Sequence, residues 1–210
     1  RKTAQGLKSL VIPCLTGNMV YALLRLGYWG DERLQKGIEW ICTYQRSDDG
    51  EAGRPQGEMY ERYAYCWGSH SCHMGVAKAL KALAAIPPEL RSDAVRAKID
   101  ELVDYFLKHH IYKKSHDLEK VSKPGWNRFG FPLMYQSDTL ELLDIMASLH
   151  VQSPCLDEAI ALVREKRRPD GTWVLENSFN GRMAVSIETK GKPSKWITLR
   201  ALRSLNAYCP

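Results

Sequence analysis

The chain has 210 residues, of which 44% are hydrophobic and 26% are charged, a composition typical of one globular domain with a sizeable core. Its net charge of +6 is scattered along the chain, without the basic block expected of a nucleic-acid-binding protein. No apolar run reaches the roughly 20 residues of a membrane span, and no signal segment opens the chain, so we expect a cytoplasmic protein. The first residues are Arg1-Lys2 rather than methionine, so a single domain over residues 1–210 that lacks an N-terminal segment is compatible with the sequence.

Apolar residues recur at helical spacing in seven segments, which turn residues separate. In chain order, the pattern predicts helices near residues 17–27, 30–45, 70–86, 92–107, 137–149, 155–166 and 194–208. Ser92 and Ser137 are the expected caps of the fourth and fifth helices. The helices pair into hairpins that repeat roughly every 60 residues, and no segment is a convincing strand.

Long loops separate the hairpins, at residues 46–64, 111–134 and 168–193, and they are rich in glycine, proline and aromatic residues. A solenoid of the HEAT or tetratricopeptide type is the alternative fold, but its turns are short. Loops of this length commonly shape a binding site.

Two of these loops begin with related motifs, Gln45-Arg46-Ser47-Asp48-Asp49-Gly50 and Lys166-Arg167-Arg168-Pro169-Asp170-Gly171-Thr172-Trp173. Each motif follows the second helix of a hairpin and resembles the Gln-x-x-Asp-Gly-x-Trp repeat of squalene cyclases and protein prenyltransferases. The resemblance implies an all-α fold, an α/α toroid in which inner helices surround a central cavity and outer helices wrap them. Three and a half hairpins are fewer than the roughly five to seven of a closed toroid. The implied ring is therefore incomplete, or it is closed by a missing segment, a partner or a second copy of the chain.

The same resemblance implies an apolar ligand, isoprenoid or lipid-like, in the central cavity. Proton-initiated cyclisation is not expected, because the Asp-x-Asp-Asp acid of class II terpenoid cyclases is not present. Three functions remain open. The first is a zinc-assisted transferase of the prenyltransferase type, the second is a non-catalytic binding or scaffold protein, and the third is a cysteine-nucleophile enzyme without metal.

The densest group of reactive side chains opens the third predicted helix, where Cys66, His70, Cys72 and His73 lie within eight residues. Cysteine and histidine are preferred zinc ligands, and the N-terminus of a helix favours a thiolate. His70-x-Cys72 also resembles the Asp-x-Cys pair that begins an inner helix in protein prenyltransferases. Six cysteines are too few for a disulfide scaffold at this length, which favours thiols that stay reduced or bind metal.

In a toroid the N-termini of the inner helices meet at one rim, so the resemblance brings this group toward Cys14, Asp138 and Lys195. We therefore predict a zinc site formed by some combination of Cys14, Cys66, His70 and Cys72. The predicted catalytic residues are Cys72, His73 and Asp138. Burial as small core residues, with His70 as a helix cap, is the alternative interpretation of these side chains.

Aromatic and basic residues near the same rim are expected to line the ligand cavity, because aromatic rings suit an apolar ligand and basic groups suit an anionic leaving group. The predicted substrate-binding residues are Tyr65, Trp67, Trp126, Arg128, Tyr135, Lys195 and Trp196. Core packing is the alternative role of the aromatic residues.

Overall fold

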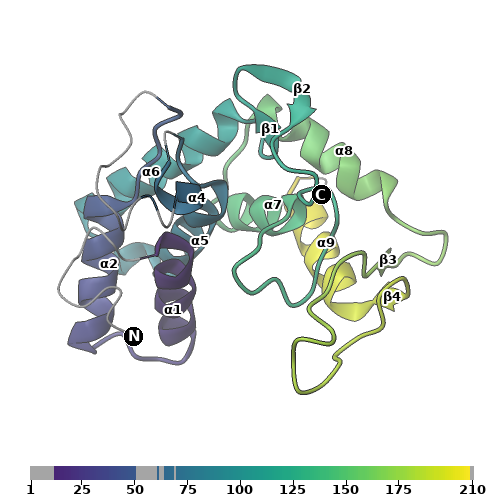
Figure 1. Ribbon diagram of the computed structural model, residues 1–210, viewed down its shortest axis with the longest axis horizontal. Coiled ribbons are helices and arrows are strands. Elements are labelled where there is room, and N and C mark those ends of the chain that lie inside the picture. Colours follow the sequence, from purple (N-terminus) through teal and green to yellow (C-terminus); the bar gives the residue numbers. More distant parts are fainter. Residues whose placement is uncertain (1–11, 51–60, 62–63, 69, 209–210) are drawn as a thin grey trace. The chain divides into compact units, whose positions relative to one another are not determined.

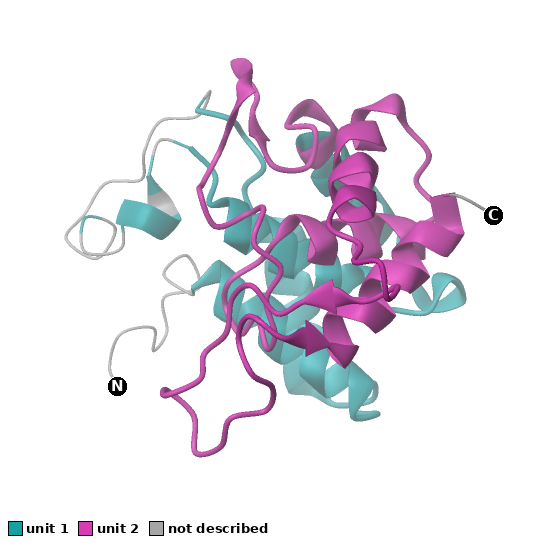
Figure 2. Cartoon of the chain, turned by 90° about the vertical axis from the view of Figure 1, so that its right-hand side faces the viewer, with its two compact units in different colours: residues 1–105 teal, residues 106–210 magenta. Residues whose placement is uncertain are grey.

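The structure is a computed structural model that describes residues 12–50, 61, 64–68 and 70–208, apart from the side chain of Trp67 (Figure 1). The chain divides into two compact units, residues 1–105 and residues 106–210 (Figure 2). All seven predicted helices are confirmed, with ends that differ from the predicted ones by a few residues. No helix in the described ranges has the length and apolar character needed to span a bilayer.

The first unit is helical in the part that the structure describes. Its elements are α1 (Pro13–Arg25), α2 (Glu32–Tyr44), α4 (Ala64–Trp67), α5 (His73–Ala84), a 3-10 turn at Pro88–Leu90 and α6 (Asp93–Lys108), whose last turn enters the second unit. Gly27 adopts a φ of 82° just after α1, and Asp31 caps α2 by accepting a hydrogen bond from the Arg33 amide at 2.8 Å. These two signals fold α1 and α2 into the predicted hairpin.

Helices α1 and α5 pack against each other, and their main chains touch at Gly17. A Cβ atom on Gly17 would stand 2.5 Å from the carbonyl oxygen of Lys78 and 2.8 Å from the amide nitrogen of Ala79, so only glycine fits at this crossing. Helix α5 is buried along most of its length, including Lys78, which is 1% exposed. In α2 the buried residues form a stripe at Leu34, Ile38 and Ile41. Helix α5 is therefore buried more completely than the amphipathic α2.

The second unit combines three helices with two small antiparallel sheets. Its elements are β1 (Lys113–Lys114), β2 (Asp117–Val121), α7 (Thr139–Ser148), a 3-10 turn at Pro154–Leu156, α8 (Asp157–Glu165), β3 (Trp173–Val174), β4 (Pro193–Ser194) and α9 (Lys195–Tyr208). Strand β1 pairs with β2, and β3 pairs with β4. The prediction that the chain has no strands was therefore wrong. These strands have two to five residues, too few for an alternating pattern to be visible in the sequence.

The core of the second unit lies between α7, α8 and α9. Leu140, Leu143 and Met146 of α7 are fully buried, as are Ile197 and Ala201 of α9. The indole of Trp173, from the second repeat motif, is also buried and donates a hydrogen bond to the Val163 carbonyl at 2.7 Å. This bond fastens the motif to α8, so the motif's tryptophan holds the loop against the preceding helix.

Candidate functional site

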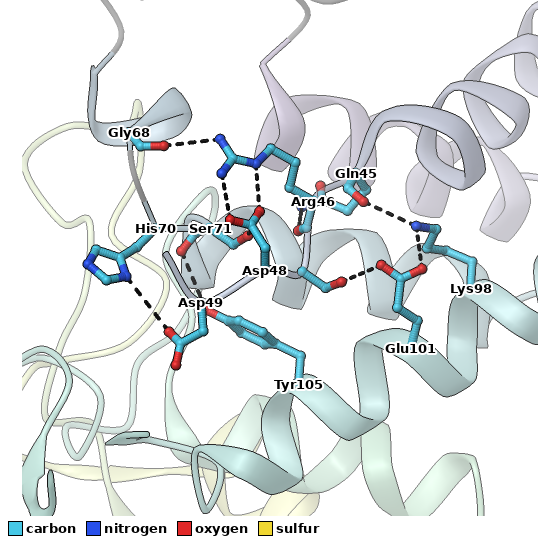
Figure 3. A network of polar contacts seen from close by, with 11 residues as sticks. Gln45, Arg46, Asp48, Asp49, Gly68, His70, Ser71, Lys98, Glu101 and Tyr105 are labelled. Carbon is cyan, nitrogen blue, oxygen red and sulfur yellow. Dashed lines mark hydrogen bonds and ion pairs between the residues drawn. The ribbon is translucent and has the colours of Figure 1, made fainter. Parts of the chain in front are cut away.

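The first repeat motif organises the segment that leads into α5 (Figure 3). Arg46 donates from Nε and Nη2 to the two carboxylate oxygens of Asp48, at 2.6 and 2.7 Å, and from Nη1 to the Gly68 carbonyl at 3.0 Å. Ser71 in turn donates from its amide to the Asp48 carbonyl and from Oγ to Asp48 Oδ1, both at 3.2 Å. The Arg46–Asp48 pair therefore holds residues 68 and 71 against the end of α2 and sets where α5 begins.

The same motif is attached to α6 on its other side. Lys98 Nζ donates to the Gln45 carbonyl at 3.2 Å and pairs with Glu101 Oε2 at 2.6 Å, and Ser47 Oγ donates to the other Glu101 oxygen (Figure 3). Three elements far apart in the sequence thus meet at one turn.

Close to this turn in the sequence of α5, His73 contacts Tyr105 of α6. The Tyr105 hydroxyl lies 2.5 Å from Nδ1 of His73 and 3.4 Å from the Ser71 carbonyl oxygen, and the two rings pack edge to face. Burial, together with the charges of Asp49, Cys72 and Asp48, strongly raises the pKa of Tyr105, so the hydroxyl keeps its proton. His73 is 8% exposed, so its ring is held inside the unit by α6.

Cys14 follows Pro13 in the first turn of α1, and Pro13 and Cys72, the N-cap residue of α5, both lie against Gly75. Burial raises the pKa of the Cys14 thiol, and the charge of Cys72 raises it further, whereas Lys78 acts in the opposite direction. Both cysteines are partly exposed. Two of the four predicted zinc ligands therefore lie at the same end of the α1–α5 helix pair.

The other two predicted ligands lie on either side of Ser69. Cys66 is part of α4, and the imidazole of His70 is 64% exposed with its Nδ1 3.9 Å from Asp49 Oδ1. The His70 ring packs against Gly50, which has a φ of 92° and where a Cβ would stand 2.6 Å from the ring. Among the residues that the structure describes, no three His, Cys, Asp or Glu side chains are placed to hold a metal ion together. The zinc site stays a prediction.

Asp138, the third predicted catalytic residue, belongs to the second unit and caps α7. Its Oδ1 accepts from the Glu141 amide at 2.7 Å and its Oδ2 accepts from the Gly130 amide at 2.8 Å. The expected cap was Ser137, and this prediction was wrong because the longer Asp138 side chain reaches both amides. Burial raises the pKa of Asp138 to about 6, with Glu141 adding to the increase and Arg200 opposing it.

The predicted substrate-binding residues differ widely in exposure. Tyr65 is 96% exposed on α4, whereas Trp126 is 1% exposed and belongs to the core. Trp196 stacks on Phe131 with a centroid distance of 5.0 Å, and Tyr135 packs edge to face on Phe179. Arg128 is exposed, and the Lys195 ammonium lies 5.6 Å from the ring centroid of Trp196. The side chain of Trp67 lies outside the described part of the chain.

A groove of about 480 Å³ lies between α8 and α9 in the second unit. Its lining consists of Arg164, Arg167, Leu202, Leu205 and Asn206, so it combines apolar side chains with guanidinium groups. The Arg167 guanidinium also faces the ring of Trp173, 5.8 Å from its centroid. None of the substrate-binding residues predicted from the sequence lines this groove.

Comparisons with models of protein families, with curated proteins and with solved structures find no match to this chain. The site therefore has to be interpreted from its own chemistry. Sequence reasoning did not identify Tyr105 or Lys78 as parts of it. Tyr105 lies 32 positions from His73 and carries no local signal, but Lys78 interrupts an apolar helix, and this was a visible signal of a buried charge.

Proposed function

We propose that this chain is a thiol-dependent enzyme on a prenyltransferase-like or terpenoid-cyclase-like helical scaffold, acting on an apolar, isoprenoid or lipid-like molecule. The observation that supports it is the position of Cys72 at the N-terminus of α5, next to Cys14 and to the His73–Tyr105 pair. The positive end of the helix dipole stabilises a thiolate at this position. An imidazole, His70 or His73, stands within two residues to accept the thiol proton.

In this proposal the Cys72 sulfur attacks an electrophilic carbon of the ligand. A sulfur–carbon bond forms as the bond to the leaving group breaks, the leaving group takes that electron pair, and the thiol proton passes to the imidazole. An acceptor nucleophile then displaces the sulfur from that carbon, takes the carbon group and regenerates the thiolate. We favour this form over the zinc-assisted transferase because it needs only Cys72 and a nearby imidazole, which the described part of the chain provides. The toroidal arrangement of the hairpins is part of the proposal and rests on the two repeat motifs.

Competitive alkylation of the reduced protein tests the proposal. With limiting iodoacetamide, we expect Cys72 to react at least about tenfold faster than Cys42, a partly exposed thiol whose pKa burial raises. Peptide mapping gives both rates in one sample, and Cys72→Ala identifies the fast phase. Equal rates would contradict a reactive centre at α5.

Metal analysis separates this proposal from the zinc-assisted transferase. The thiol form predicts less than about a tenth of an equivalent of zinc in the purified protein. One equivalent of zinc that is lost in both Cys72→Ala and His70→Ala would instead support the metal enzyme. Extraction of the purified protein with organic solvent, followed by mass spectrometry, identifies the class of bound ligand in either case.

A second candidate function, non-catalytic binding, is favoured by the groove between α8 and α9. Two leucines beside two arginines suit an apolar chain that ends in an anionic group. Leu202 is 46% exposed there, so Leu202→Glu places a carboxylate in the groove without disturbing the core. If binding is the function, this variant loses the co-purified ligand while Cys72→Ala keeps it.

A further inference from the structure

The N-terminal turns of α1 and α5 lie against each other. A Cβ atom on Gly75 would stand 2.9 Å from Cβ of Pro13 and 3.7 Å from Cβ of Cys72, so these two side chains approach the same point from different helices. Cys14 is the residue after Pro13. One turn further along α1, Gly17 contacts the main chain of α5 at Lys78. The main-chain contact therefore holds Cys14 and Cys72 at the same end of one helix pair.

The pKa of the Cys14 thiol also responds to charges on α5. The charge of Cys72 acts on Cys14 to raise its pKa, after burial as the larger cause, and the ammonium of Lys78 lowers it. Both cysteines are partly exposed, whereas Lys78 of the same helix pair is buried at 1% exposure. Two partly exposed cysteines at one end of a helix pair that also carries a buried lysine form a site distinct from a lone surface cysteine.

We propose that Cys14 and Cys72 are a peroxide-sensitive dithiol that closes reversibly into a disulfide between α1 and α5. In the first step, one thiolate attacks an oxygen of hydrogen peroxide, the O–O bond breaks, and a sulfenic acid forms with release of hydroxide, which becomes water on protonation. In the second step, the other thiolate attacks the sulfenic sulfur, the S–S bond forms, and the hydroxyl group leaves as water after protonation. Each peroxide molecule thus takes two electrons from the pair and yields two water molecules.

Cys42 and Cys155 are the cysteines with which the Cys14–Cys72 pair can be compared. Cys42 lies on α2, where its thiol is influenced by burial and by Lys98 and no cysteine contributes to its pKa. Cys155 lies in the 3-10 turn before α8, in the other unit. A thiol without a neighbouring thiol stops at the sulfenic acid or proceeds to higher oxidation states. The pair is therefore expected to differ from these residues in the product as well as in the rate.

Non-reducing peptide mapping of the full chain tests this inference. The reduced protein is treated with a small excess of hydrogen peroxide, blocked with N-ethylmaleimide and digested. We expect one linked peptide pair that contains Cys14 and Cys72, lighter by two hydrogen atoms than the separate peptides and cleaved by dithiothreitol. In Cys14→Ser the link is lost and dimedone traps a sulfenic acid on Cys72, and in Cys72→Ser the link is lost as well. Cys42→Ser is the matched control and keeps the link.

Two results would overturn the dithiol: full N-ethylmaleimide labelling of Cys14 and Cys72 after peroxide, or a link from Cys72 to another cysteine such as Cys66. The inference does not depend on the proposed enzyme, because disulfide closure needs only the spacing of the two sulfur atoms. A Cys72 that alkylates rapidly but does not link to Cys14 would contradict the dithiol alone. A linked pair with ordinary alkylation rates would contradict the proposed function alone.

Discussion

The Tyr105 hydroxyl donates to one of two acceptors, Nδ1 of His73 at 2.5 Å or the Ser71 carbonyl at 3.4 Å, and this choice sets the histidine tautomer. If the hydroxyl donates to Ser71, His73 must carry its proton on Nδ1, and the lone pair then lies on Nε2. In that arrangement the Tyr105 hydroxyl donates to the Ser71 carbonyl and accepts from Nδ1 of His73, so all three groups are hydrogen-bonded. It also gives His73 a basic Nε2, which is the atom that a general base or a metal ligand would use.

Replacing Tyr105 by phenylalanine tests this arrangement. The variant Tyr105→Phe removes the hydroxyl and leaves the ring packing, so we expect a loss of about 1–2 kcal/mol in the free energy of unfolding. Urea unfolding measures the loss, and ¹⁵N chemical shifts of the His73 ring report the tautomer in the unmodified protein. Tyr65→Phe on the exposed face of α4 is the control and is expected to change stability by less than about 0.5 kcal/mol.

The Arg46–Asp48 pair is expected to govern local opening of the segment before α5. Arg46→Lys cannot reproduce the two parallel hydrogen bonds to Asp48 together with the bond to Gly68. We expect the Ser71 amide, which donates to the Asp48 carbonyl, to exchange its hydrogen about tenfold faster in this variant. Arg33→Lys breaks a pair of similar geometry, but Arg33 is 87% exposed, and its loss should leave exchange at Ser71 unchanged.

Asp138 gives the second unit a predictable pH dependence. Because its pKa in the folded protein is about 6 and its ordinary value is 3.8, its contribution to stability is fully present below about pH 4 and is lost as the pH rises through 6. The loss is on the order of 3 kcal/mol. Asp138→Asn keeps an oxygen for the Glu141 amide and cannot ionise, so the difference in unfolding free energy between variant and unmodified protein should grow in favour of the variant from pH 4 to 7.

The control for this titration is Asp170→Asn. Hydrogen bonds from Thr172 and the charge of Arg168 lower the pKa of Asp170 from its ordinary value. Its replacement should leave the slope between pH 4 and 7 unaltered. An Asp138→Asn difference that is constant across this range would show that the Asp138 carboxyl titrates normally.

The crossing of α1 and α5 should tolerate no side chain at residue 17. In Gly17→Ala the added Cβ would stand 2.4 Å from the carbonyl carbon of Lys78, so the helices must separate, at a cost of about 1–3 kcal/mol. Gly30→Ala is the matched control, because a Cβ at Gly30 meets nothing within 4 Å. Thermal unfolding of the two variants compares them directly, and equal melting temperatures would contradict the close contact.

Apolar periodicity was sufficient to predict every main helix, because apolar residues recur at helical spacing in each of them. It did not reveal β3 and β4, which pair across a loop of about twenty residues and are too short to have a pattern of their own. The cysteines and histidines of the site were visible as residue types, and the contact between His73 and Tyr105 was not. That contact depends on how α6 packs against α5, which local sequence does not encode.

The main-chain contact at Gly17 limits how far mutations can change the separation of α1 and α5. Side chains that separate two helices change the distance between them whenever one apolar residue replaces another, but peptide groups in contact have fixed dimensions. The distance between Cys14 and Cys72 is therefore insensitive to most substitutions in the surrounding core, which would lower stability first. Gly17 and Gly75 set how closely α1 and α5 approach each other. A chain that kept Cys14 and Cys72 but lost these glycines would keep both thiols without the helix spacing that brings them together.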